Sequence, residues 1–291
     1  YSKENADINY LIANAYFEKE EYQNALIYYN NAVSLNQSNP LYFRDLAITL
    51  ARTGDREKAE SKLLQAKELG LEEPSALLVS GELLLSKGEY NNAISEFNKV
   101  INKTDDNEII FRAYILSSDA YKKNNDINNQ ISLLETARKN LPVEYQNPIL
   151  ISLANAYSLK SQQNSDEYIE FAKKALDVNL VLYQNGYQSE SLLINLSNLY
   201  QRLTQFDNAL KVLTEAKDKY PESYKVFLRL AFLETDIQSK IEENKRDYTL
   251  VANYYNTAKK YYKTAQNNGV SDPEMKKLET IIAKLKEGKW L

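Results

Sequence analysis

Two cations in this sequence have a spacing that could hold an anion. Lys225 and Arg229 lie four residues apart, and on a helix this spacing puts both side chains on one face, aimed at the same carboxylate. The alternative is that both are ordinary solvated charges. Neighbouring acids at expected turns lack the buried setting that separates the pKa values of a catalytic pair. These pairs are Glu72–Glu73, Asp105–Asp106 and Glu242–Glu243.

The residue types that are absent exclude much chemistry. The 291 residues contain no His and no Cys, which excludes Ser-His and Cys-His nucleophiles, imidazole acid–base catalysis, the usual zinc sites and disulfides. The run at 105–108 lacks the alternating ligands and the glycine of a calcium-binding loop. An enzyme built on carboxylates alone is the remaining catalytic alternative, and no pair of acids lies in an expected pocket. We therefore expect no enzyme, no catalytic residue, no metal and no cofactor.

Composition favours an all-α protein. The chain has only 7 Gly and 6 Pro, too few for a fold with many strands and tight turns but enough for long helices with short connections. The net charge is −4, so the chain lacks the excess of basic residues that binds the phosphates of a nucleic acid. No stretch is long and apolar enough to span a bilayer. We expect neither nucleic-acid binding nor membrane insertion by this segment.

A pattern of small and aromatic residues recurs along the chain. Its first copy consists of Ala13, Tyr16, Tyr22, Ala25, Tyr29 and Ala32. The small residues Ala13, Ala47 and Gly81 step by 34, and looser copies follow to the end of the chain. A period of 34 with this pattern resembles the tetratricopeptide (TPR) repeat, in which each unit is a pair of antiparallel helices. One such pair cannot bury its apolar face alone, so neighbouring pairs must stack.

The resemblance implies an all-α, right-handed TPR solenoid of about seven helical hairpins and a C-terminal capping helix. We expect one continuous array over residues 1–291. The expected repeats are about 6–39, 40–73, 74–107, 111–144, 147–180, 190–223 and 224–271, with the capping helix at about 273–287. Trp290 should fold back on the last pair.

Several segments depart from the regular repeat. Polar or charged insertions are expected at 162–166 and 238–246, and the stretch 180–189 is longer than a normal turn between repeats, which would permit a modest wobble. Most tyrosines fall where the repeat needs bulk. Less constrained tyrosines, which could be surface anchors, are Tyr28, Tyr42, Tyr114 and Tyr254.

The resemblance also suggests binding residues. In the TPR cochaperones that bind chaperones, two Asn, a Lys and an Arg on three successive repeats hold the C-terminal carboxylate of a peptide. This sequence resembles that clamp at Asn155, Asn195, Lys225 and Arg229. It departs from the clamp at Ile151, which replaces a lysine, and the first three repeats do not match it. Other polar residues expected to face the groove are Asn14, Arg44, Arg52, Glu82, Asp119, Asn198 and Arg202. Their mixed signs favour a polar, extended peptide.

The expected function is a protein–protein interaction module that binds an extended peptide or a partner helix in its concave groove. The alternative is a regulatory or sensor TPR region of a larger signalling protein. The chain begins with Tyr1 rather than Met, and residues 272–291 resemble the ends of TPR regions attached to serine/threonine kinases of Gram-positive bacteria. That resemblance implies an upstream kinase and a place on the cytoplasmic or extracytoplasmic side of a bacterial membrane protein.

Overall fold

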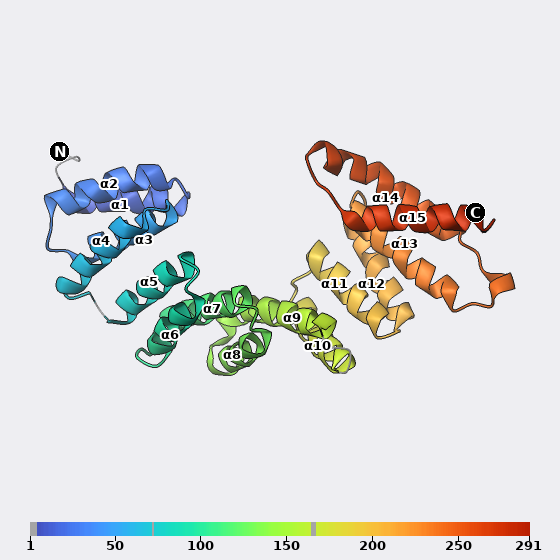
Figure 1. Cartoon of the computed structure of the whole chain (residues 1–291), viewed down its shortest axis with the longest axis horizontal. Helices are drawn as coiled ribbons and strands as arrows, with labels where there is room; N and C mark the ends of the chain where they lie inside the picture. Colours follow the sequence, from blue (N-terminus) through green and yellow to red (C-terminus); the bar gives the residue numbers. More distant parts are fainter. Residues whose placement is uncertain (1–4, 72, 164–166) are drawn as a thin grey trace. The chain divides into compact units, whose positions relative to one another are not determined.

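The structure, a computed structural model, describes residues 5–71, 73–163 and 167–291, and every regular element among them is helical (Figure 1). The expected all-α TPR fold is confirmed, because antiparallel helices follow one another in pairs. The contacts of the chain group into two compact units, Tyr1–Ile149 and Leu150–Leu291. The single array over 1–291 therefore stays a prediction.

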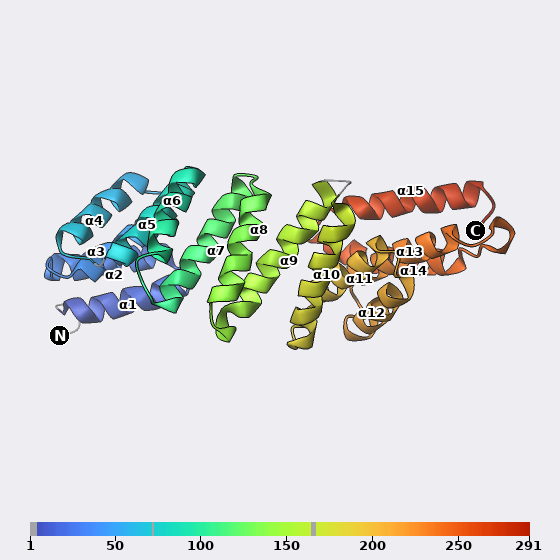
Figure 2. The ribbon, with the colours of Figure 1, turned by 90° about the horizontal axis from the view of Figure 1, so that it is seen from below.

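The first unit contains four helical hairpins. Its helices are α1 (Ala6–Glu18), α2 (Tyr22–Leu35), α3 (Pro40–Arg52), α4 (Arg56–Glu68), α5 (Glu73–Ser86), α6 (Tyr90–Ile101), α7 (Asn107–Lys123) and α8 (Ile127–Asn140), followed by the short 3-10 helix η1 (Val143–Tyr145). Each helix packs against the next, and α5 also lies beside α3 and α7 (Figure 2). Ala13 and Ala25 are completely buried, as expected where helices approach closely.

Local signals explain where these helices begin and end. Pro40 occupies the first turn of α3, and the Asn39 side chain accepts a hydrogen bond from the Leu41 N–H, which satisfies one of the unpaired N–H groups at a helix start. Gly54 follows α3 with φ +89°, a left-handed conformation that is unstrained for glycine. Local residue types therefore specify where these helices start and stop.

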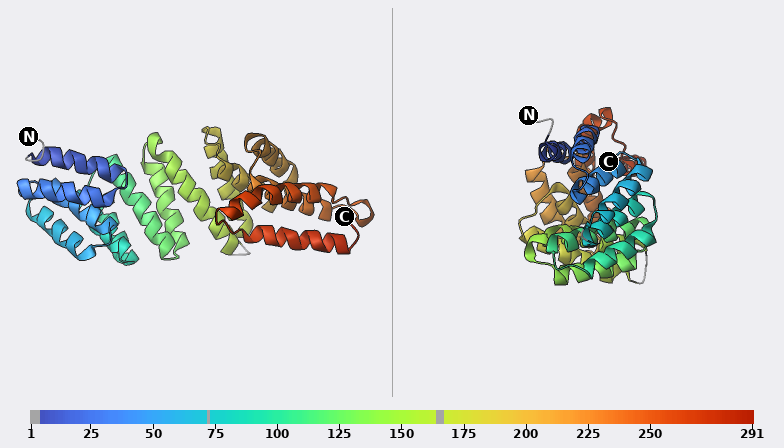
Figure 3. Two further views of the ribbon diagram at one scale, coloured as in Figure 1. Left: turned by 90° about the horizontal axis from the view of Figure 1, so that it is seen from above. Right: turned by 90° about the vertical axis from the view of Figure 1, so that its left-hand side faces the viewer.

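The second unit continues with the same kind of pairs. Its helices are α9 (Gln146–Gln163, which begins at the end of the first unit), α10 (Tyr168–Gln184), α11 (Glu190–Arg202), α12 (Phe206–Lys219), α13 (Tyr224–Ser239), α14 (Thr249–Asn267) and α15 (Pro273–Glu287), with the 3-10 helix η2 (Glu243–Lys245) before α14. The rings of Tyr157 and Phe171 meet between α9 and α10, with centroids 6.0 Å apart. Helix α15 packs on α13 and α14 (Figure 3).

The capping helix is confirmed at 273–287. The Asp272 side chain accepts from the Glu274 N–H at its start, and the apolar face of α15 is buried through Met275, Leu278 and Ile282. Trp290 folds back as expected, and its ring meets that of Tyr248 edge-on at 5.8 Å.

Some expectations need correction. Helix α7 begins at Asn107, four residues before the expected start of the fourth repeat, because the Asp106 side chain caps it there. Helix α10 continues to Gln184, so half of the stretch 180–189 is helix rather than a long turn. Tyr42 and Tyr114 are 1% and 4% exposed and are core residues, not surface anchors. Of the insertion expected at 162–166, residues 164–166 lie outside the described residues.

Candidate functional site

Two adjoining cavities lie on the first helices of the four hairpins in the first unit. The larger has a volume of about 330 Å³ and the smaller about 210 Å³. Ile48, Arg52 and Glu82 line both cavities, so the two form one depression, here called the N-terminal groove. Its other lining residues are Tyr10, Asn14, Phe17, Glu18, Tyr29, Arg44, Asp45, Ala51, Leu85, Ser86, Arg112, Leu116, Asp119 and Lys123.

Helical spacing brings these side chains to one surface. Arg44, Ile48 and Arg52 follow one another at intervals of four on α3, and Tyr10 and Asn14 have the same interval on α1. Residues four apart lie on one face of a helix. Because the second helix of each hairpin packs behind the first, these faces stay open to a ligand.

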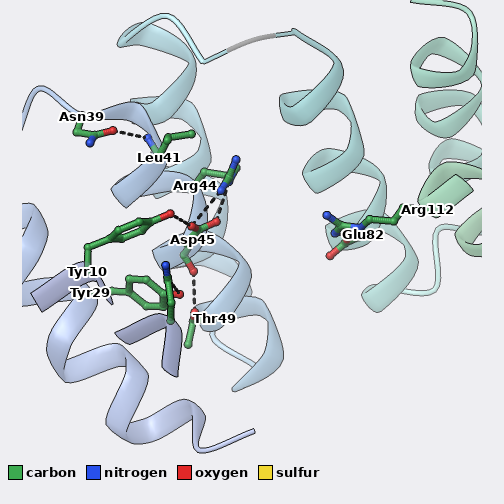
Figure 4. Close-up of polar contacts among 10 residues, drawn as sticks. Tyr10, Tyr29, Asn39, Leu41, Arg44, Asp45, Thr49, Glu82 and Arg112 are labelled. Carbon is green, nitrogen blue, oxygen red and sulfur yellow. Dashed lines mark hydrogen bonds and ion pairs between the residues drawn. The ribbon is translucent and has the colours of Figure 1, made fainter. Parts of the chain in front are cut away.

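A hydrogen-bonded cluster forms the wall of the larger cavity. Tyr10 donates its hydroxyl to Asp45 Oδ2 at 2.6 Å, and Arg44 donates from Nε at 2.7 Å and from Nη2 at 3.0 Å to the same carboxylate (Figure 4). Beside it, the Tyr29 hydroxyl donates to Asn14 Oδ1 at 2.7 Å. The cluster links α1, α2 and α3, so the groove wall is ordered before any ligand arrives.

Burial and charge keep these phenols neutral. Burial is the largest cause that raises the pKa of Tyr10 to about 12, and the neighbouring Asp45 carboxylate adds to it. Burial likewise raises the pKa of Tyr29 well above its usual value. Both hydroxyls therefore act as hydrogen-bond donors and not as bases at ordinary pH.

Other groove charges are paired within the protein. Glu82 of α5 accepts from Arg112 Nη2 of α7 at 2.8 Å (Figure 4), and Asp119 pairs with Lys123 at 2.9 Å. Arg52 and Glu18 differ, because in the described part of the chain neither has a hydrogen bond or an ion pair, and both are exposed.

The residues expected to face a groove fall into two sets. Asn14, Arg44, Arg52 and Glu82 line the larger cavity, and Asp119 lines the smaller one. Asn198 and Arg202 lie on α11 of the second unit.

Arg202 donates from Nη1 to the buried Ser161 Oγ at 3.3 Å, which ties α11 to α9. Asn198 is half-buried on the same helix. Their role in binding stays a prediction.

Sequence reasoning missed most of the lining residues, among them Tyr10, Glu18, Ile48 and Arg112. Tyr10 and Ile48 stand four residues from Asn14 and Arg44, so helical spacing alone could have found them. Arg112 was missed because the fourth repeat was expected to begin at 111, whereas α7 begins a turn earlier and brings Arg112 opposite Glu82.

The four clamp-like residues lie on α9, α11 and α13 of the second unit. Asn155 and Lys225 are exposed, and Asn195 is half-buried. Arg229 donates to both carboxylate oxygens of Glu274 on α15, at 3.0 Å from Nη1 and closer still from Nη2. Arg229, which was expected to bind a ligand's carboxylate, is therefore already paired with a carboxylate of the capping helix.

The second unit also has cavities. One of about 500 Å³ lies between α14 and α15, where Lys259, Glu279 and the Tyr255 hydroxyl bond to one another. Another, of about 430 Å³, includes Lys225 in its lining. Among the described residues, no three acidic side chains gather into a metal site, and no helix combines the length and apolar character needed to cross a bilayer.

Comparisons with known proteins agree on the repeat. Residues 6–39, 44–108 and 192–223 match models described as tetratricopeptide repeat. Small glutamine-rich tetratricopeptide repeat-containing protein 2 of Mycosarcoma maydis is 24% identical over 109 residues, which are 38% of this chain and 31% of that protein. The match thus spans about a third of the relative's length.

Solved structures extend the likeness to most of the chain. The C-terminal part of a TPR repeat-containing protein from Cytophaga hutchinsonii has a TM-score of 0.60 at 12% identity, covering 86% of this chain and 93% of that one. PilF of Pseudomonas aeruginosa has a TM-score of 0.56 at 15% identity, covering 81% of this chain and 97% of that one. These likenesses show the fold.

Proposed function

We propose that this chain is a non-enzymatic protein-interaction module whose N-terminal groove binds an extended segment of another protein. The observation that carries the proposal is the pair of adjoining cavities on the first helices of four successive hairpins. Stacked helical repeats typically use the surface formed by such helices to bind partners.

The groove has the properties of a peptide site. Its wall is ordered by the Tyr10–Asp45–Arg44 cluster, so little conformational entropy remains to be lost on binding. Ile48 supplies an apolar contact at the place where the two cavities meet. The lining is largely polar and runs along several helices, which suits an extended chain with many hydrogen-bonding groups better than a compact apolar molecule.

A defined peptide library tests the proposal. The full chain is immobilised, random twelve-residue peptides displayed on phage are selected, and an enriched peptide is titrated by calorimetry against the protein and its variants. Ile48→Asn should weaken binding by about 1–2 kcal/mol, or roughly tenfold in Kd, because it removes a buried apolar contact. Ile48 is partly buried against the core, and we expect the fold to accept Asn there because equivalent positions on the neighbouring first helices carry Asn14, Glu82 and Asp119; circular dichroism of the variant checks this.

The matched control is Lys67→Ala. Lys67 is an exposed residue of α4 that lines neither cavity, so binding should be unchanged. Peptides that bind wild type and Ile48→Asn equally would place the interaction elsewhere and refute the groove as the site.

The signalling alternative uses the same fold in a longer polypeptide. It is supported only by the resemblance of residues 272–291 to kinase-linked repeats. The coding sequence upstream of Tyr1 tests it: a kinase catalytic domain there supports a sensor role, and a plain signal peptide contradicts it.

A further inference from the structure

Two opposite charges of the N-terminal groove have no partner among the residues that the structure describes. Arg44 is bound to Asp45 and Arg112 to Glu82, so in the described part of the chain these cations are already neutralised. Glu18 and Arg52 line the larger cavity, and neither has a hydrogen bond or an ion pair with any residue in 5–71, 73–163 or 167–291; Arg52 also lines the smaller cavity. A ligand can pair with these two charges without breaking any bond of the protein.

The repeat fixes how the two charges are arranged. Glu18 is the last residue of α1 and Arg52 the last of α3, and they occupy equivalent positions one 34-residue period apart. Helices α1 and α3 lie side by side, joined by the Tyr10–Asp45 hydrogen bond. Packed helix axes are roughly 10 Å apart, and an extended peptide advances about 3.3 Å per residue. In a peptide that crosses from α1 to α3, the side chains that meet the two charges are therefore about three positions apart.

We infer that the N-terminal groove selects an extended peptide with a basic and an acidic side chain about three residues apart, the basic one at Glu18 and the acidic one at Arg52. This inference rests on the proposed function and adds the chemistry of the ligand. It also gives the ligand a direction, because the two charges differ in sign.

The paired cations are poorer sites for the ligand's acid. Arg44 is half-buried and makes two bonds to the Asp45 carboxylate, which also holds the Tyr10 hydroxyl. Drawing Arg44 away would leave Asp45 partly buried without its cation, which is costly. Arg52 carries no such cost, and Ile48, one turn earlier on α3, offers an apolar contact beside it.

A charge-swap selection tests the inference. The same twelve-residue phage library is selected on three full-length proteins: wild type, Glu18→Lys/Arg52→Glu, and Lys67→Glu/Glu68→Lys. Each double variant reverses two charges and keeps the net charge. Lys67 and Glu68 are exposed on α4 and line neither cavity.

Wild type and the α4 control should both enrich peptides with a basic and an acidic residue two to four positions apart. The groove swap should enrich the same spacing in the opposite order. The best wild-type peptide should bind the groove swap at least about tenfold more weakly, since two attractions become repulsions. Circular dichroism checks that all three proteins have the same helix content.

The two possible failures are distinguishable. In the first, Ile48→Asn weakens the binding of the enriched peptides, but wild type and the groove swap enrich the same sequences. The groove then binds peptides, and the charge inference is wrong. If none of the enriched peptides responds to Ile48→Asn, the proposed function itself fails. The inference would also be wrong if the α4 control, and not the groove swap, enriched peptides in which the basic and acidic residues stand in the opposite order.

Discussion

Gly81 is the position where one added methyl group should disturb the fold most clearly. It is the small residue of the third repeat, inside α5, at the place that Ala13 and Ala47 occupy in the first two repeats. A Cβ atom there would lie 2.4 Å from Cε1 of Phe97, which is completely buried on α6. In the second repeat the residue equivalent to Phe97 is the smaller Leu63, and in the first it is Tyr29, which is combined with Ala13. The short Cβ distance at Gly81 is therefore a property of this repeat's packing.

The expected net effect of Gly81→Ala is a loss of about 1 kcal/mol. Alanine favours a helix interior over glycine by about 1 kcal/mol. Non-bonded carbon atoms normally stay about 3.5–4.0 Å apart, so the ring and the methyl group must separate by more than 1 Å, and such overpacking costs about 1–3 kcal/mol. The packing cost should therefore exceed the gain in helix propensity.

Urea unfolding followed by circular dichroism measures this effect. A loss of about 1 kcal/mol should lower the midpoint by roughly 0.5 M urea, and Phe97→Leu combined with Gly81→Ala should lose less than the sum of the single changes, by about 1–2 kcal/mol. The control Ser95→Ala, on the exposed face of α6, gains propensity without a clash and should not destabilise. A Gly81→Ala protein as stable as wild type, with additive double-mutant effects, would refute the reasoning.

Three further changes probe other parts of the molecule. Because the folded pKa of Tyr10 is raised to about 12, its stabilising effect is complete below pH 10 and is lost as pH rises toward 12, so Tyr10→Phe should reduce the fall of the urea midpoint in that interval. Leu278→Ala should cost about 2–5 kcal/mol, since this completely buried side chain holds α15 in place. Lys225→Ala should weaken a peptide that ends in a free carboxylate more than its amidated form, if the predicted clamp is used.

Each of these has its own check. If the urea midpoint falls equally with rising pH in Tyr10→Phe and in wild type, the loss of stability at alkaline pH comes from other tyrosines. Thr280→Ala, on the exposed side of α15, is the control for Leu278→Ala and should stay within about 0.5 kcal/mol of wild type. Equal effects on the free and amidated peptides would contradict a carboxylate clamp at Lys225.

The helices were predictable because close packing requires small residues at fixed intervals. Ala13, Ala25, Ala47 and Gly81 are recognisable without coordinates. The largest differences from the expected hairpins are the start of α7 at Asn107 and the end of α10 at Gln184. Five residues that line the N-terminal groove could be placed from the same register: Asn14, Arg44, Arg52, Glu82 and Asp119.

The ion pairs between helices were not predictable. Arg112 meets Glu82 30 residues away, and Arg229 meets Glu274 across 45 residues and an irregular connection. Such pairs depend on side-chain rotamers and on how far one helix is shifted along the next, neither of which the repeat period specifies. For this reason the sequence pointed to Arg229 as free and gave no sign that Arg52, rather than Arg44 or Arg112, would lack a partner among the described residues of the N-terminal groove.

Because Trp290 contacts Tyr248, tryptophan fluorescence can follow the unfolding of the second unit separately from the first. Trp290 is the only tryptophan of the chain, and it reaches the core of α13–α15 through that contact. Its fluorescence therefore reports the melting of this end alone, whereas circular dichroism averages over every helix. The gap between the two denaturation curves measures how strongly the two halves of the chain depend on each other for stability.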